Sequence, residues 1–125
     1  MLNHKLKITG GSLKSRSLSF SEGASLKPTK SYIRESIFNI IELNKDTTCL
    51  DLFSGSGILT AEAISRGVKR ATLVENNFKT CQKIHSEFRK LNITNYDLVQ
   101  SSVFTFLKNH KNKFHEIIFI DPPFN

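Results

Sequence analysis

A glycine-rich turn between an apolar segment and a helical segment constrains the fold of this 125-residue chain most strongly. Residues 48–53 are mostly apolar and predict a strand, residues 54–57 have the sequence Ser-Gly-Ser-Gly, and residues 58–66 predict a helix that Gly67 closes. A strand that ends at Gly-x-Gly before a helix lets a ligand approach the backbone, because glycine has no Cβ. The turn therefore predicts a nucleotide-like cofactor site, although a plain strand-to-helix connection has the same pattern.

The segments after this turn repeat the alternation of strand and helix. Strands are expected at residues 71–74, 95–100 and 116–120, and helices at 78–91 and 103–108. Such alternation predicts an α/β fold with a parallel sheet and right-handed crossovers. The continuous apolar run 116–120 is typical of a strand covered on both faces. In the helix 78–91, we expect Glu87 on the polar side and a buried face of Phe78, Cys81, Ile84, Phe88 and Leu91.

The N-terminal part has a different pattern, and we expect two regions: a basic arm (residues 1–28) and a cofactor-binding domain (residues 29–125). Alternation in residues 5–9, followed by Leu18 and Phe20, predicts a small hairpin. Residues 29–43 predict an amphipathic helix capped by Thr29 or Ser31, with an apolar core-facing stripe and with Arg34 facing away from it.

Positive charge is concentrated in this arm and the start of the following helix. Residues 1–34 hold seven lysine and arginine residues and one glutamate, which is +6 of the chain's formal charge of +7. A basic arm on a nearly neutral body favours binding to a polyanion such as RNA, and the expected contacts are Lys14, Arg16, Lys27 and Arg34. A solvated lysine-rich surface is the alternative.

Composition indicates the compartment. Only two cysteines are present, and the apolar runs are too short for a membrane span. We expect a cytoplasmic protein without a disulfide, metal site or membrane segment.

Polar side chains end the predicted strands. In a parallel sheet these ends share one edge, so Asp51, Glu75, Ser102 and Asp121 are expected to converge there. Glu75 follows Gly57 by 18 residues and is well placed to bind ribose hydroxyls.

Charge and spacing indicate which cofactor the turn holds. Thr60 stands where a dinucleotide site has its third glycine, and Asp51 would repel a pyrophosphate. The same carboxylate would attract the ammonium and sulfonium groups of S-adenosylmethionine, which is the cofactor we expect.

The sequence Asp121-Pro122-Pro123-Phe124 is the most specific motif of the chain. Consecutive prolines restrict the backbone, so the Asp121 carboxylate and the Pro122 carbonyl can accept both hydrogens of an exocyclic amine. Phe124 offers a face on which an unstacked base can lie. These four residues predict a site for methyl transfer to a nucleobase amine that depends on positioning rather than on a covalent nucleophile.

Together, the turn and this motif resemble class I S-adenosylmethionine-dependent amino-methyltransferases, which have a Rossmann-like parallel sheet. Residues 10–16 (GGSLKSR), 27–29 (KPT) and 33–40 (IRESIFNI) further resemble the bacterial RsmD family, which methylates a guanine amine in small-subunit ribosomal RNA. The resemblance implies that rRNA, or its assembling ribonucleoprotein, is the partner. It also implies cofactor contacts by the residues Thr29, Asp51, Phe53, Gly55, Gly57, Glu75, Asn76 and Ser102.

The chain departs from this family pattern at three points. Lysine replaces the usual arginine at Lys27, serine replaces the usual aspartate at Ser102, and the sequence supplies four strands where the class I sheet has seven. We therefore expect a chain that is truncated relative to its family and whose last strand forms an open sheet edge. Alternatives are a DNA adenine-amine methyltransferase, a non-catalytic module that binds cofactor or RNA, and, less favoured, a nicotinamide oxidoreductase.

Overall fold

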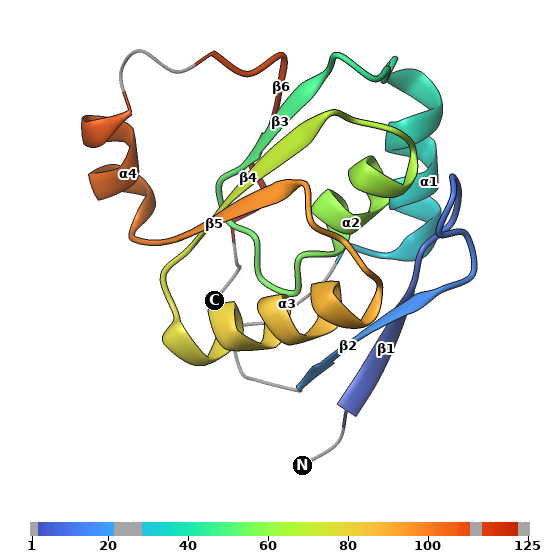
Figure 1. Ribbon diagram of the computed structural model, residues 1–125, viewed down its shortest axis with the longest axis horizontal. Coiled ribbons are helices and arrows are strands. Elements are labelled where there is room, and N and C mark those ends of the chain that lie inside the picture. Colours follow the sequence, from blue (N-terminus) through green and yellow to red (C-terminus); the bar gives the residue numbers. More distant parts are fainter. Residues whose placement is uncertain (1–2, 22–28, 111–113, 123–125) are drawn as a thin grey trace.

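The computed structural model describes residues 3–21, 29–110 and 114–122. Within them lie six strands and four helices (Figure 1). In chain order these are β1 (Asn3–Lys7), β2 (Ser17–Ser21), α1 (Ser31–Ile40), β3 (Thr48–Asp51), α2 (Ile58–Ser65), β4 (Arg70–Glu75), α3 (Phe78–Lys90), β5 (Tyr96–Gln100), α4 (Val103–Asn109) and β6 (Ile117–Phe119).

The central sheet is parallel and has the strand order β5-β4-β3-β6. In its register Cys49 of β3 lies opposite Ala71 of β4 and Ile117 of β6. The predicted α/β fold with a four-stranded parallel sheet is therefore confirmed. Because β3 and β4 are both central, the turn after β3 opens near the middle of the sheet edge.

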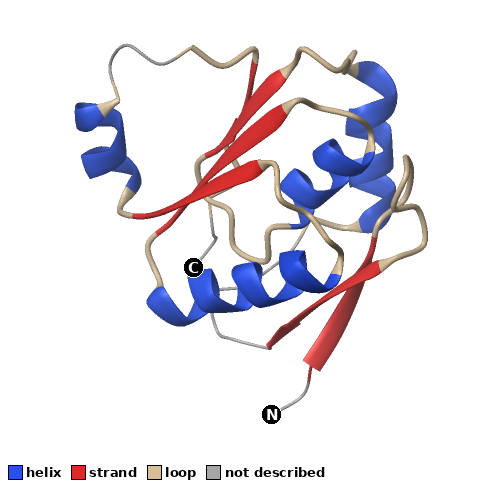
Figure 2. Cartoon of the chain, viewed as in Figure 1, coloured by secondary structure: helices blue, strands red, loops and turns tan. Residues whose placement is uncertain are grey.

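Helices cover the two sheet faces unequally (Figure 2). On one face, Phe38 of α1 and Ala63 of α2 pack with Cys49, while Ile84 and Phe88 of α3 pack with Leu73. On the other face, α4 contributes Phe106 to a cluster with the buried residues Leu50, Leu52 and Val74. The alternation of side chains along β3 and β4 explains this division.

The hairpin of β1 and β2 packs over α2 and α3 rather than standing apart. Ile8 and Leu18 are fully buried in one cluster with Ile58 and Phe88. The predicted hairpin is confirmed, and it contributes to the same hydrophobic core as the parallel sheet. The division into regions 1–28 and 29–125 stays a prediction.

Helix α1 differs from the prediction at both ends. It begins after Lys30, which makes no side-chain capping bond, and ends at Ile40 instead of Leu43. Neither Thr29 nor Ser31 caps it: Lys30 is the N-cap residue, Ser31 is the first helical residue, and the Thr29 hydroxyl donates to Asp121 instead. Its apolar stripe is only partly buried, since Ile33 and Ile40 are exposed and Phe38 supplies the buried contact.

Two predictions for α3 are also wrong. Phe78 is exposed, whereas Glu87, which we expected on the polar side, is buried. The Glu87 carboxylate accepts a 2.6 Å hydrogen bond from the Ser19 amide and a 2.9 Å bond from Lys90 Nζ. Burial opposes ionisation, but these two partners hold the pKa of Glu87 below its usual range. The hairpin therefore covers a polar position of α3, not only its apolar stripe.

Strand β6 forms one edge of the sheet. We expected it to be covered on both faces, but Ile118 is 50% exposed while Phe119 is buried. Helix α4 packs over β3 and β4 and not over β6, so the second face of β6 lacks a helix among the described residues. None of the helices in these ranges is long and apolar enough to span a membrane.

Candidate active site

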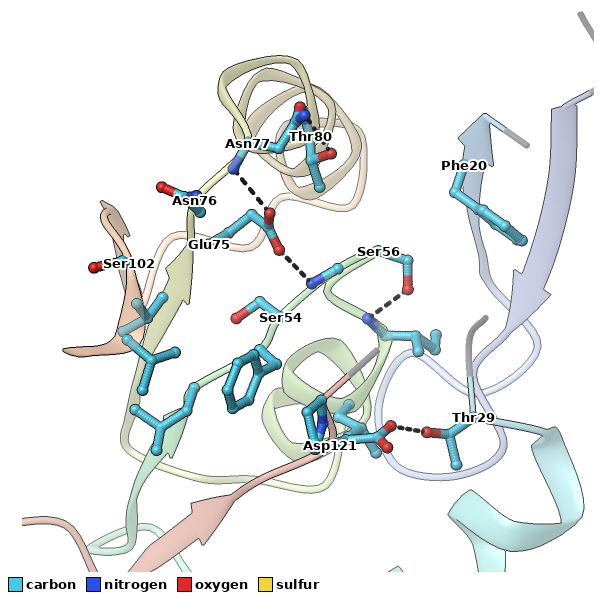
Figure 3. A pocket seen from close by; sticks show the side chains of 18 of the residues that line it. Phe20, Thr29, Ser54, Ser56, Glu75, Asn76, Asn77, Thr80, Ser102 and Asp121 are labelled. Carbon is cyan, nitrogen blue, oxygen red and sulfur yellow. Dashed lines mark hydrogen bonds between the residues drawn. The ribbon is translucent and has the colours of Figure 1, made fainter. Parts of the chain in front are cut away.

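A cleft of about 700 Å³ lies at the carboxyl edge of the sheet (Figure 3). Its walls come from the glycine turn, the ends of β4 and β5, the start of α1, and residues 121–122 after β6. Figure 3 shows Glu75 on one side of the turn and Asp121 on the other. The volume is in the range of small-molecule sites.

Glu75 ties the end of β4 to the glycine turn. Its Oε1 atom accepts a 3.0 Å hydrogen bond from the Gly55 amide, and Oε2 accepts a 2.9 Å bond from the Asn77 amide. Asn77 in turn caps α3 by accepting a bond from the Thr80 amide. The carboxylate is thus held in one orientation at the cleft wall.

Gly57 has a packing role that sequence reasoning did not predict. It has φ of 82°, precedes α2, and does not line the cleft. A Cβ at this position would lie 3.2 Å from Cε1 of Phe88. The absence of a side chain at Gly57 therefore lets α3 approach the turn from behind, while Gly55 lies in the cleft wall.

Asp51 lies behind the turn rather than in the cleft wall. It is 1% exposed, its Oδ2 atom accepts a 2.9 Å bond from the Thr60 hydroxyl, and Oδ1 has no hydrogen-bond donor among the described residues. Burial raises the pKa of Asp51 to about 7; the Thr60 bond opposes this change, and the charges of Asp121 and Glu75 add to it. A direct contact of Asp51 with a ligand is not favoured by this position.

The remaining predicted cofactor residues line the cleft. Phe53 and Asn76 follow β3 and β4, and Ser102 precedes α4. The Ser102 hydroxyl accepts a bond from the Thr105 amide, which caps α4, and donates a 2.9 Å bond to the Thr105 hydroxyl, so only its remaining lone pair is available to a ligand.

Asp121 and Pro122 lie at the opposite side of the cleft, just beyond β6. The Thr29 hydroxyl donates a 2.6 Å hydrogen bond to Asp121 Oδ2. This bond joins residues 92 positions apart, and it brings the start of α1 against the predicted catalytic motif. Pro123 and Phe124 of the motif lie outside the described residues, as does Lys27.

The predicted RNA contacts have different environments. Lys14 and Arg16 are exposed on the turn between β1 and β2, which binds Ser65 at the far end of α2 from the cleft. The expectation that Arg34 faces outward is wrong, because its side chain is 1% exposed and pairs with Glu62. Burial makes an RNA contact by Arg34 untenable in this fold.

Residues of the cleft wall that sequence reasoning missed include Phe20, Thr80 and Phe104. The alternation of Leu18 and Phe20 indicates that Phe20 points inward from the hairpin, so this position could have been found. No comparable signal marks Phe104, which is exposed beside Ser102. In the described part of the chain, no group of three or more histidine, cysteine or acidic side chains is arranged to hold a metal ion.

A family model described as "Conserved hypothetical protein 95" matches residues 6–125. The chain belongs to this family. The match includes the end of β1, all of β2, the glycine turn and the Asp-Pro-Pro-Phe motif, so it covers both walls of the cleft.

Relatives of this family carry the name that the resemblance predicted. The chain is 40% identical over 124 residues to ribosomal RNA small subunit methyltransferase D of Buchnera aphidicola, covering 98% of this chain and 65% of the relative. It is 36% identical over 121 residues to the protein of that name from Escherichia coli, covering 96% and 61%. The predicted resemblance to the RsmD family is confirmed.

A solved structure shares the fold. The putative methyltransferase yhhF from Escherichia coli superposes with a TM-score of 0.81 at 34% identity, covering 98% of this chain and 66% of that one. The Rossmann-like class I methyltransferase fold is therefore confirmed for the part present. The chain spans about three fifths to two thirds of the length of these relatives.

Proposed function

We propose that this chain forms the cofactor and acceptor cleft of an S-adenosylmethionine-dependent methyltransferase that modifies a guanine exocyclic amine in small-subunit ribosomal RNA. The observation that carries the proposal is the convergence of the glycine turn, Glu75 and Asp121 on one cleft. The names of the relatives support a ribosomal RNA substrate and an enzyme, which would act in the cytoplasm.

The donor side of the cleft comprises the turn and the ends of β4 and β5. Glu75, held by the Gly55 and Asn77 amides, would bind the ribose hydroxyls. Phe53, Asn76 and Ser102 would surround the nucleoside, and Thr29, which lines the same cleft, would lie near the reacting group. Asp51 would support the turn from behind through its hydrogen bond with Thr60, and Gly57 would act through packing. When bound, S-adenosylmethionine supplies an electrophilic methyl group on a sulfonium.

The acceptor side comprises Asp121 and Pro122, with Pro123 and Phe124 following in the sequence. The Asp121 carboxylate and the Pro122 carbonyl would accept the two amine hydrogens and direct the nitrogen lone pair toward the methyl group. In the transfer that this arrangement would support, the amine nitrogen would bond to the methyl carbon as the carbon–sulfur bond breaks and the neutral thioether leaves, and the nitrogen would lose one proton to the Asp121 carboxylate, which would pass it to water. The carboxylate reduces the cost of the positive charge that develops on nitrogen.

RNA would approach over the N-terminal part of the chain. Lys14 and Arg16 are exposed, and Lys27 precedes the start of α1 in the sequence. Neutralising backbone phosphates needs no base specificity, so these residues would contribute affinity and the cleft would select the base.

The test is transfer of labelled methyl from S-adenosylmethionine to small-subunit particles or their RNA, with double-stranded DNA as competitor. We expect transfer to RNA that Asp121→Ala abolishes and that Asp46→Ala preserves, because Asp46 is exposed near the opposite sheet edge.

Transfer that survives Asp121→Ala would overturn the assignment of the acceptor side. Preferential transfer to DNA would indicate the adenine-amine alternative. Cofactor binding without transfer by this chain would indicate a binding module.

A further inference from the structure

Arg34 is the largest fully buried side chain of the described residues, although it lies on the first turns of α1. Its guanidinium lies 3.6 Å from the Glu62 carboxylate of α2. A buried guanidinium is stable only when hydrogen-bond acceptors and a countercharge match it. Each contact of Arg34 therefore restrains the element that supplies the acceptor.

The Arg34–Glu62 pair is fixed to the core on one side. Glu62 accepts hydrogen bonds from the Thr9 and Gly10 amides at 3.0 Å each and from Arg66 Nε at 3.0 Å. Arg34 itself donates a 3.0 Å bond to the Lys7 carbonyl at the end of β1. The guanidinium is therefore anchored to both α2 and the hairpin.

On its other side, Arg34 binds the residue that touches the candidate catalytic motif. Its Nε atom donates a 3.2 Å hydrogen bond to the Thr29 carbonyl, and the Thr29 hydroxyl donates the 2.6 Å bond to Asp121. Thr29 thus links the buried guanidinium of Arg34 to the exposed carboxylate of Asp121. Asp121 is exposed and follows an edge strand, and the bond from Thr29 directly restrains its carboxylate.

We propose that Arg34 is a positioning residue that holds Thr29 in place, so that the Thr29 hydroxyl orients the Asp121 carboxylate toward the acceptor amine. The role of Asp121 in this statement rests on the proposed function. The mechanical coupling from Arg34 through Thr29 to Asp121 does not, and it can be measured without turnover.

The first measurement is the carboxyl carbon resonance of Asp121 in ¹³C-labelled full chain, assigned with Asp121→Asn. We expect Thr29→Val to move this resonance, Thr29→Ser to restore it, and Arg34→Lys to move it in the same direction as Thr29→Val. In the Thr29→Val background, Arg34→Lys should cause no further change, because the coupling passes through the missing hydroxyl.

The matched control is Arg66→Lys. Arg66 also binds Glu62, but it contacts Thr9 and not Thr29. We expect it to leave the Asp121 resonance in place even where it lowers the melting temperature. An Asp121 resonance that ignores Arg34→Lys, or that responds equally to Arg66→Lys, would overturn the proposal.

A reciprocal measurement covers the case in which Arg34→Lys does not fold. The Arg34 Nε–H resonance is followed in the Asp121→Asn and Thr29→Val variants, whose changes lie outside the buried pair. Coupling is reciprocal, so this resonance should move in both variants, and an unchanged resonance would contradict the coupling.

Where methyl transfer is measurable, Thr29→Val and Arg34→Lys should each lower kcat roughly tenfold to a hundredfold with little change in the KM for the methyl donor. If the wild-type chain transfers no methyl group, the proposed function is rejected, but the positioning role of Arg34 is not. Intact transfer that neither variant affects would reject the positioning role alone.

Discussion

Two buried carboxylates, one toward each end of helix α2, have opposite environments. Glu62, near the C-terminal end, is 0% exposed and receives hydrogen bonds from two backbone amides and from Arg66, with Arg34 close by. Asp51, beside the N-terminal turn, is 1% exposed and receives one bond from Thr60, while its Oδ1 atom has no donor among the described residues.

This contrast distinguishes a carboxylate that attaches structural elements to the core from a carboxylate that lies beside a candidate ligand site. The satisfied carboxylate fastens the hairpin and α1 to the core, and so it supports the Thr29 side of the cleft. The unsatisfied carboxylate lies directly behind the glycine turn, where its desolvation opposes ionisation. Removing each carboxylate should therefore have opposite consequences for stability.

Glu62→Gln should produce the largest effect. It leaves Arg34 buried without its countercharge, and loss of one partner of such a pair costs about 3–5 kcal/mol. Urea unfolding measures the loss, with the exposed Glu35→Gln as control. A Glu62 variant as stable as this control would show that the two ends of α2 do not differ in the stated way.

Asp51→Asn should stabilise the protein at neutral pH. The folded-state pKa of Asp51 lies at about 7, against 3.8 for an unperturbed carboxyl, so the folded chain holds a proton over this interval that the unfolded chain releases. Wild-type stability should therefore fall as pH rises from about 4 to about 7, by up to about 4 kcal/mol.

The asparagine variant lacks this titration. Its stability advantage over wild type should grow across the same pH interval and then remain constant, as followed by urea unfolding at several pH values. A difference that does not change with pH would contradict the buried, poorly paired state of Asp51.

Alanine substitutions of the glycines next to the two ends of α2 compare the cost of backbone strain at these ends. Gly11 contacts the C-terminal end of α2 with φ of 80°, and a Cβ there would collide with the Ser65 carbonyl. At Gly57 the nearest atom to a Cβ would be in the Phe88 ring at 3.2 Å. Strain at either site costs about 1–3 kcal/mol, and Gly11→Ala should cost more because backbone cannot move aside as easily as a ring. Equal melting temperatures for the two alanine variants would contradict this ranking.

The sequence allowed prediction of the parts of the site that depend on local pattern. Short apolar segments that alternate with helical segments predict parallel strands, and residues at their carboxyl ends share one edge, so Glu75, Ser102 and Asp121 were expected together and all line the cleft. The glycine turn was predicted for the same reason, because it lies between a strand and the helix that follows it.

Features that depend on distant residues were missed. Burial of Arg34 depends on Lys7 and Glu62, and burial of Glu87 depends on Ser19, which is 68 residues away. A helical pattern alone assigns both side chains to solvent. Likewise, the Thr29 hydroxyl binds Asp121, 92 residues away, and Lys30 rather than Thr29 stands at the N-cap of α1.

The most direct test of the central claim is a calorimetric titration of the full chain with S-adenosylhomocysteine and, separately, with nicotinamide adenine dinucleotide. We expect one S-adenosylhomocysteine to bind per chain, the dinucleotide not to bind, and Glu75→Gln to weaken binding roughly tenfold to a hundredfold, as loss of a charged hydrogen bond predicts. The exposed Glu42→Gln serves as control. Binding of the dinucleotide instead, or affinity that Glu75→Gln leaves unchanged, would contradict the assignment of this cleft to a methyl donor.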